Sequence, residues 1–213
     1  MARHNFILAD SLSQKGWDVI IPDYFEGDGL PIQLLKRNPN LSIDEHPWSE
    51  EDKDKLRNLD FPTWTKRHDH SRVSEILGSL LKELDVQYKG CPRFGVGYCF
   101  GGKHVLRLGK QGLKAIAAFH PSFVEEQDLE GVQAPVYIGL AGADTMVPAS
   151  LHDDLMMWRA NGMERMVPFE MEVYPDMPHG FAARPESENL IIRAQYCKAL
   201  EKAAEHLAKY SET

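Results

Sequence analysis

The chain has few cysteines and no long apolar run. Its three cysteines, Cys91, Cys99 and Cys197, are odd in number and lack metal-ligand spacing, which argues against a disulfide framework and a Cys-rich zinc site. This usage is typical of a reducing compartment, so we expect a cytoplasmic protein. No stretch of 18 apolar residues occurs, and residues 1–5 lack the apolar segment of a signal peptide. Neither a transmembrane helix nor a secretion signal is therefore expected.

Positive charge is also in short supply. The chain contains 24 Lys and Arg residues and 32 Asp and Glu residues, which gives a formal net charge of −8. Such a balance argues against nucleic acids and anionic membranes as partners, although a local arginine can still hold a small anion. With 43% hydrophobic residues, the chain can bury one core. We expect a single domain over residues 1–213, a monomer or homodimer, with a small-molecule substrate and no cofactor.

The most specific motif lies in residues 94–102, which read FGVGYCFGG. Gly97 and Gly101 stand two positions before and after Cys99, the spacing of a nucleophile elbow between a strand and a helix. The nucleophile of such an elbow has a strained backbone, so bulky residues at the two flanking positions would clash. The helix N-terminus that follows favours a thiolate. The alternative is a glycine-rich turn with a buried, inert cysteine.

Two later segments supply an acid and a base. An apolar run over 134–141 predicts a buried parallel strand that ends just before Asp144, and an alternating run over 169–174 predicts a strand that ends just before His179. Open α/β sheets bind ligands at the carboxyl ends of their strands, and the order nucleophile, acid, histidine is that of α/β-hydrolases. Taken alone, Asp144 could instead cap a helix over 149–161, and His179 could be a solvated loop residue.

The chemistry of these residues is self-consistent. A free thiol is only slightly ionised at neutral pH, so Cys99 benefits from His179 as a general base. Asp144 would fix the tautomer of the imidazole and stabilise its charged form. The backbone N–H of Phe100, the residue after the nucleophile, is a natural donor to the oxyanion.

These motifs resemble the dienelactone hydrolase family, the cysteine-nucleophile members of the α/β-hydrolase fold. The resemblance implies a mostly parallel sheet flanked by helices, with Cys99 as nucleophile, His179 as base and Asp144 as its orienting acid. It implies hydrolysis of a lactone, ester or thioester. The matching segments are residues 97–102 (GYCFGG), Asp144 with Val147-Pro148 behind it, residues 179–181 (HGF) and residues 22–25 (PDYF).

Substrate-binding candidates lie near the same motifs. Family members bind an anionic substrate with an arginine a few residues beyond the histidine, and Arg184 lies five residues beyond His179. The alternative is a solvated arginine. Tyr98, beside the nucleophile in sequence, is the second candidate. His120 ends a predicted strand and could border the site, although a core-edge histidine is the favoured interpretation.

The remaining elements follow from periodicity. Residues 26–67 are rich in Pro, Gly and charge, and we interpret them as an excursion with one or two short helices. This excursion could serve as a lid or pocket wall, which we favour, and the alternative is a surface loop. The pair His68 and His70 does not share a helix face, so no metal is expected. Helices are predicted over 5–15, 71–88 and 186–210, and strands over 17–24 and 113–120.

The chain departs from the family pattern at its start. By resemblance, residues 17–24 would be the fourth strand and the elbow strand the fifth. The first three strands, the loop that supplies a second oxyanion donor and a glutamate that contacts the thiol have no counterpart. We therefore expect a truncated or naturally shortened chain, in which residues 17–24 pair directly with the elbow strand or stand apart.

Three functions fit this sequence. The first is a cysteine hydrolase whose small substrate carries a carboxylate or is neutral. The second is a catalytically impaired or non-catalytic relative, with a truncated oxyanion hole, that acts as a small-molecule binding protein. The third is an acyl-transfer or isomerising enzyme that uses the same three residues and excludes water.

Overall fold

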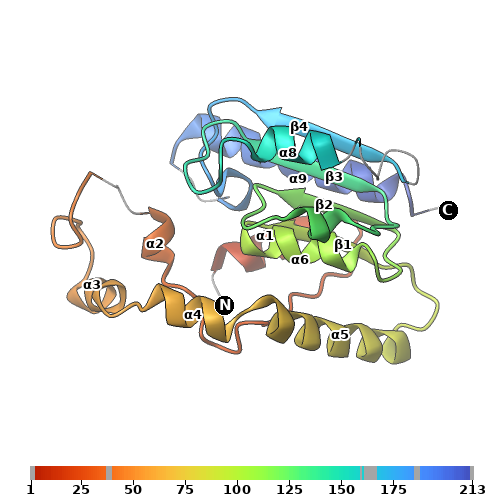
Figure 1. Cartoon of the computed structure of the whole chain (residues 1–213), viewed down its shortest axis with the longest axis horizontal. Helices are drawn as coiled ribbons and strands as arrows, with labels where there is room; N and C mark the ends of the chain where they lie inside the picture. Colours follow the sequence, from red (N-terminus) through yellow and green to blue (C-terminus); the bar gives the residue numbers. More distant parts are fainter. Residues whose placement is uncertain (1–2, 37–39, 159, 161–166, 185–187, 212–213) are drawn as a thin grey trace. The chain divides into compact units, whose positions relative to one another are not determined.

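The chain divides into two compact units. The computed structural model describes residues 3–36, 40–158, 160, 167–184 and 188–211 (Figure 1). The first unit comprises residues 21–89 with Arg3, and the second comprises residues 4–20 and 90–213. The candidate site residues all belong to the second unit. Each unit is described by itself.

A parallel four-stranded sheet forms the centre of the second unit. Its strands lie in the order β1 (Phe94–Tyr98), β2 (Ala115–Phe119), β3 (Val136–Ala141) and β4 (Phe169–Tyr174). All five residues of β2 are completely buried. This explains why its sequence, AIAAF, is continuously apolar, since a central parallel strand is covered on both faces. The predicted fold class, a parallel sheet flanked by helices, is confirmed.

Helices cover both faces of this sheet (Figure 1). Helices α6 (Phe100–Leu108) and α8 (Leu151–Trp158) lie on one face, and α1 (Arg3–Ser13) and α9 (Leu190–Ala208) lie on the other. The short helix α7 (Glu126–Leu129) follows β2, and a 3₁₀ turn, η2 (Phe181–Ala183), precedes α9. The α/β alternation along the chain thus gives the layered architecture expected of it.

The main core lies between the sheet and α9. Ala117 and Phe119 of β2 pack with Tyr137 of β3 against Ala199 and Ala203 of α9, and all five are at most 4% exposed. The small alanines let the helix approach the sheet closely. A second cluster joins Leu8 and Leu12 of α1 to Tyr196 and Leu200 of α9. The predicted amphipathic N-terminal helix is therefore present and is held by its apolar face.

The predicted strand over 17–24 is wrong. Residues 17–23 form neither helix nor strand, and a turn begins at Tyr24. A strand needs a neighbour for its backbone hydrogen bonds, and the sheet formed by the described residues contains only β1 to β4. The Trp17 ring instead packs edge-on against Phe94 of β1, with ring centres 4.9 Å apart. Of the two predicted outcomes, the segment stands apart from the sheet.

The other predicted elements occur with shifted ends. The helices predicted over 5–15, 71–88 and 149–161 correspond to α1, α5 (His70–Gln87) and α8, and the strand over 113–120 to β2. Residues 159 and 161, at the predicted end of the α8 helix, lie outside the described residues. The C-terminal helix begins at Leu190 rather than at 186, and residues 186–187 also lie outside the described residues.

The first unit is helical. Besides α5 it contains α2 (Ile32–Lys36), α3 (Glu50–Arg57) and α4 (Phe61–Arg67), where one or two short helices were predicted. Ser49, Asp60 and Asp69 cap α3, α4 and α5 through side-chain oxygens that accept a backbone N–H. These caps explain where the helices start within a polar sequence. A lid role for residues 26–67 stays a prediction.

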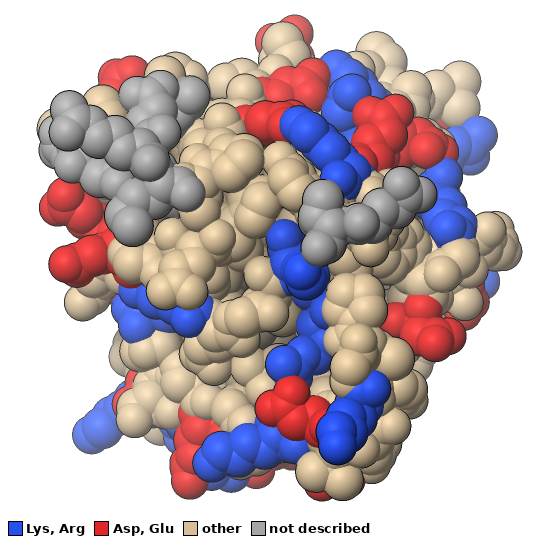
Figure 2. Space-filling model, turned by 90° about the vertical axis from the view of Figure 1, so that its right-hand side faces the viewer, with Lys and Arg blue, Asp and Glu red and all other residues tan. Residues whose placement is uncertain are grey.

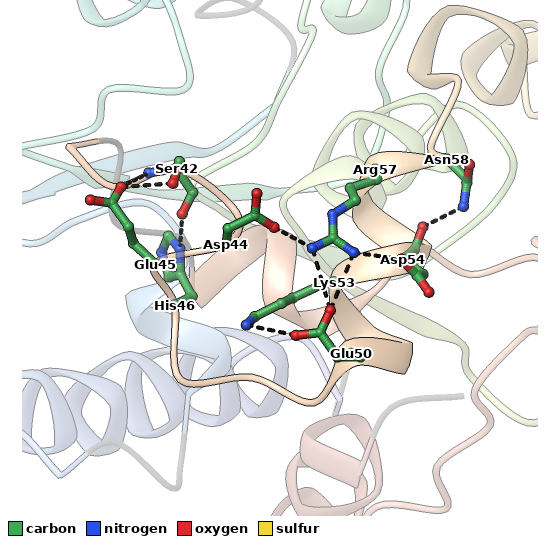
Figure 3. A network of polar contacts seen from close by, with 9 residues as sticks. All are labelled: Ser42, Asp44, Glu45, His46, Glu50, Lys53, Asp54, Arg57 and Asn58. Atoms are coloured by element: carbon green, nitrogen blue, oxygen red, sulfur yellow. Dashed lines mark hydrogen bonds and ion pairs between the residues drawn. The ribbon is translucent and has the colours of Figure 1, made fainter.

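Polar contacts organise this unit. Figure 3 shows Arg57 of α3 between Asp44, Glu50 and Asp54, which ties the preceding loop to the helix. These groups are largely exposed, so each pair contributes little to stability. Elsewhere, Asp28 accepts hydrogen bonds from Arg67 and from His68, whose Nε2 lies 2.9 Å away. His68 thus has a structural partner.

The surface carries charges of both signs. On the face seen in Figure 2, basic and acidic side chains are interspersed. None of the helices in the described ranges is both long and apolar enough to cross a membrane.

Candidate active site

Cys99 forms the elbow between β1 and α6. Its backbone has φ 52° and ψ −119°, a conformation that a residue with a side chain rarely adopts. A Cβ atom at Gly97 would lie 2.7 Å from the carbonyl carbon of Gly101 and 2.8 Å from Val105 Cγ1. A Cβ atom at Gly102 would lie 2.7 Å from Pro121 Cβ. The glycines of the motif therefore permit the close approach of strand, turn and helix.

Cys99, Asp144 and His179 lie together at the carboxyl edge of the sheet. The Nε2 atom of His179 is 2.9 Å from Cys99 Sγ, and its Nδ1 atom is 2.7 Å from Asp144 Oδ2. The other carboxylate oxygen, Oδ1, accepts the N–H of Met146 at 2.9 Å. The side chains of His179 and Asp144 are 3% and 4% exposed. The imidazole is thus held between the thiol and a buried carboxylate, and its ring orientation is fixed.

The electrostatics favour an ion pair. Burial would raise the pKa of the Cys99 thiol, but hydrogen bonding and charge attraction from His179 lower it below its usual value. Burial would lower the pKa of His179, but its hydrogen bonds with Asp144 and Cys99 raise it to about 9. Both shifts favour the same state, a thiolate beside an imidazolium.

One backbone donor lies beside the sulfur. The N–H of Phe100, the first residue of α6, donates a hydrogen bond to the Cys99 sulfur. The oxyanion role predicted for this N–H stays a prediction. The N–H lies at a helix N-terminus, where partial positive charge supports an anion.

The two predicted substrate-binding residues, Arg184 and Tyr98, have different surroundings. The Nη2 atom of Arg184 donates to the carbonyl oxygen of His179 at 3.0 Å. The guanidinium approaches Gly180, where an added Cβ would lie 3.1 Å from it. The Tyr98 ring stacks on Phe119 with centres 5.5 Å apart, and its hydroxyl is buried. Arg184 thus borders the histidine loop, whereas Tyr98 faces packed core. Their binding roles stay predictions.

The loop after β2 adds two residues to the site. Ser122, which sequence reasoning did not single out, is 3% exposed, and its Oγ lies 3.4 Å from both Cys99 Sγ and His179 Nε2. His120 is 1% exposed, and its ring centre lies 4.9 Å from that of His179. Burial, together with the charge of His179, lowers the pKa of His120 well below its usual value, so it is neutral. His120 is therefore both a buried histidine and a neighbour of the site.

Within the ranges that the structure describes, no group of three or more His, Cys, Asp or Glu side chains could hold a metal ion.

The fold and the site define a class of protein. A parallel sheet with a strained nucleophile elbow before a helix, and with an acid and a histidine following later strands, is an α/β-hydrolase. The sequence model of the dienelactone hydrolase family matches residues 2–211. The chain belongs to the dienelactone hydrolase family.

Individual relatives agree with this assignment. The chain is 29% identical over 211 residues to hydrolase tropI of Talaromyces stipitatus. This alignment covers 96% of this chain and 74% of that protein. It is 30% identical over 183 residues to dienlactone hydrolase 1 of Gibberella moniliformis, covering 84% of this chain and 62% of that protein. The chain thus spans only part of the length of these relatives.

A solved structure shares the fold. The dienelactone hydrolase-like promiscuous phosphotriesterase P91 from metagenomic libraries superposes with a TM-score of 0.51 at 18% identity. The match covers 65% of this chain and 60% of that chain. At this identity the likeness concerns the fold alone.

Proposed function

We propose that the protein hydrolyses an ester, lactone or thioester bond of a small molecule, with Cys99 as nucleophile, His179 as acid and base, and Asp144 as orienting acid. One observation carries this proposal. The contacts from Cys99 Sγ to His179 Nε2 and from His179 Nδ1 to Asp144 form one continuous chain, at 2.9 and 2.7 Å. Membership of the dienelactone hydrolase family supports it.

The first half of the reaction acylates the cysteine. The thiolate attacks the substrate carbonyl carbon, and an S–C bond forms while the carbonyl oxygen becomes an oxyanion. The N–H of Phe100 donates to that oxygen. When the tetrahedral intermediate collapses, the bond to the leaving oxygen or sulfur breaks, and the leaving group takes the proton from His179 Nε2. In a lactone the leaving group stays attached to the acyl chain.

The second half restores the thiolate. His179, now neutral, removes a proton from water, and the resulting hydroxide attacks the thioester carbonyl. The S–C bond breaks, the acid product leaves, and the proton stays on Nε2 of His179. The cycle therefore ends with the same thiolate and imidazolium with which it began, and Asp144 stabilises the imidazolium throughout.

The pH dependence of kcat/KM is expected to have two limbs. The thiolate is lost as pH falls through the lowered pKa of Cys99, and the imidazolium is lost as pH rises through about 9. Activity toward a neutral ester should therefore be highest between the two pKa values and fall about tenfold per pH unit above the upper one. The measurement is kcat/KM against pH in one constant-ionic-strength buffer series.

Asp144→Asn is the matched control for this profile. It removes the carboxylate that raises the pKa of His179, so the upper limb should move to lower pH. Activity that keeps rising through pH 9 in the unaltered protein would contradict the ion pair and indicate an un-ionised thiol that needs a free base.

A carboxylate-bearing substrate is proposed to bind Arg184. Arg184→Ala should then slow hydrolysis of a carboxylate ester tenfold or more, because a charge-assisted hydrogen bond contributes about 1.5–3 kcal/mol. A neutral ester of the same size should be affected little. Arg193→Ala, which removes an exposed arginine of α9, is the control. An equal loss with both esters would instead assign Arg184 to holding the His179 loop through its carbonyl contact.

The proposed activity is tested with a panel of aryl esters, lactones and thioesters. The expected result is free acid formed at a rate far above that of Cys99→Ala with at least one of these compounds. Binding without any such difference would favour the non-catalytic alternative. If methanol added to the reaction diverts the product to a methyl ester without any free acid, the acyl-transfer alternative holds instead.

A further inference from the structure

The last residue of β2 and the loop that follows it bind the backbone of Cys99 on both sides. The N–H of Cys99 donates to the carbonyl of Phe119 at 3.1 Å, and the N–H of Ser122 donates to the carbonyl of Cys99 at 3.0 Å. Pro121 packs against Gly102, where an added Cβ would lie only 2.7 Å away. The loop therefore has a fixed position relative to the elbow.

The conformation of this loop is itself unusual. His120 and Phe123, on either side of Ser122, have φ of 37° and 58°, values that residues with side chains seldom adopt. The ammonium of Lys103 on α6 donates to the carbonyl of Phe123 at 2.7 Å and helps to hold this arrangement. Strain of this kind persists only where the surroundings determine it, and it is frequent at functional sites.

The loop directs one hydroxyl at the two reacting groups. Ser122 Oγ lies 3.4 Å from Cys99 Sγ and 3.4 Å from His179 Nε2, and Ser122 is only 3% exposed. The sulfur and Nε2 are themselves 2.9 Å apart. The three atoms thus form a closed triangle, with the hydroxyl beside the line along which the proton moves.

We propose that Ser122 is a positioning residue, whose hydroxyl donates to the Cys99 thiolate before attack and accepts the N–H of His179 once the sulfur is bonded to the acyl carbon. This inference rests on the proposed role of Cys99 as nucleophile. A hydroxyl carries one donor and two acceptor lone pairs, so it can serve both groups in turn by rotating. No additional proton is gained or lost in this exchange.

The need for such a residue follows from the reaction. Before attack, Nε2–H of His179 points at a negative sulfur that accepts it. After attack the sulfur is a neutral, thioether-like sulfur of the tetrahedral intermediate and a poor acceptor, while the proton must remain in place for the leaving group. A hydroxyl oxygen beside Nε2 keeps the imidazolium in its orientation through this interval. Without it, the hydrogen bond between Nδ1 and Asp144 remains, but Nε2 loses an acceptor for its N–H.

Asp144, His120 and Arg184 are charged or titratable residues that contact His179, one corner of this triangle. Asp144 contacts His179 from the loop after β3, and His120 packs on the His179 ring from the same loop as Ser122. Arg184 contacts the His179 carbonyl from the end of η2. None of these side chains is altered by replacing the Ser122 hydroxyl, so a change in the titration of Cys99 can be assigned to that hydroxyl.

The test uses Ser122→Ala, which keeps the backbone N–H that donates to Cys99. The apparent pKa of Cys99 is read from the pH dependence of its alkylation by iodoacetamide, located by peptide mass spectrometry. Loss of a hydrogen bond to a thiolate should raise this pKa by about one unit. With a hydrolysed ester, kcat should fall on the order of tenfold while KM changes little.

Matched variants separate this role from a structural one. Ser11→Ala removes a hydroxyl that bonds to the Ile7 carbonyl on α1 and should change neither readout. Ser122→Thr retains the hydroxyl and should keep the alkylation profile of the unaltered protein. An unshifted profile in folded Ser122→Ala, or a shifted one in Ser122→Thr, would overturn the proposal. Alkylation needs no turnover, so this result is independent of whether an ester is hydrolysed.

Discussion

Cys99→Ala and His179→Ala are each expected to reduce kcat by roughly 10⁴-fold or more, and the double variant should be little slower than either single one. The thiolate and the imidazolium stabilise one another across 2.9 Å, so removal of either destroys the same reactive state. Residues that act as a unit in this way are strongly non-additive. The measurement is single-turnover and steady-state hydrolysis of the best ester in the panel.

Two controls accompany these variants. Cys91→Ala and Cys197→Ala remove exposed thiols and should leave kcat unchanged. Asp144→Asn should cost less than either central substitution, because the residue orients the base and does not itself react. Full additivity of the Cys99 and His179 effects in the double variant would count against a shared mechanism.

Gly97→Ala is expected to destabilise the second unit by about 3 kcal/mol or more. The added methyl group would meet the Gly101 carbonyl, and it would lie 2.7 Å from the carbonyl carbon and 2.8 Å from Val105. The backbone of the elbow cannot move away, because Cys99 is bound through both its N–H and its carbonyl. Overpacking against fixed backbone is more costly than against a flexible side chain. The measurement is the urea midpoint followed by circular dichroism.

Gly78→Ala provides the comparison. Gly78 lies within α5, and an added Cβ there would have no other atom within 4 Å. This substitution should therefore stabilise its helix by up to about 1 kcal/mol. If Gly97→Ala unfolds at the same urea concentration as the unaltered protein, the strand and helix of the elbow do not approach one another closely at Gly97. Close packing would then not explain the glycine at this position.

Much of the second unit follows from local sequence patterns. The continuous apolar runs of β2 and β3 fit buried parallel strands, and the glycine spacing around Cys99 fits the strained elbow that the structure contains. These features are local, because each is set by burial or by contacts within a few residues. The same reasoning brought Cys99, Asp144 and His179 to one edge of the sheet, since parallel strands end together.

The errors arise where the outcome depends on distant neighbours. Residues 17–24 have the composition of a strand, but a strand forms only where another strand can pair with it, and sequence alone does not show that partner. Ser122 was overlooked because a serine after a proline is an ordinary turn residue. Its position beside Cys99 comes from the backbone contacts of the loop, which no local pattern encodes.

The most direct test of Cys99 as the nucleophile is to alkylate it and to measure the remaining ester hydrolysis. A variant that carries Cys91→Ser and Cys197→Ser has Cys99 as its single thiol. Ester hydrolysis is measured together with the fraction of Cys99 modified by iodoacetamide. We expect activity to fall in proportion to this fraction and to reach the level of Cys99→Ala when labelling is complete. Hydrolysis that continues at its initial rate on fully alkylated protein would contradict the role of Cys99 as nucleophile.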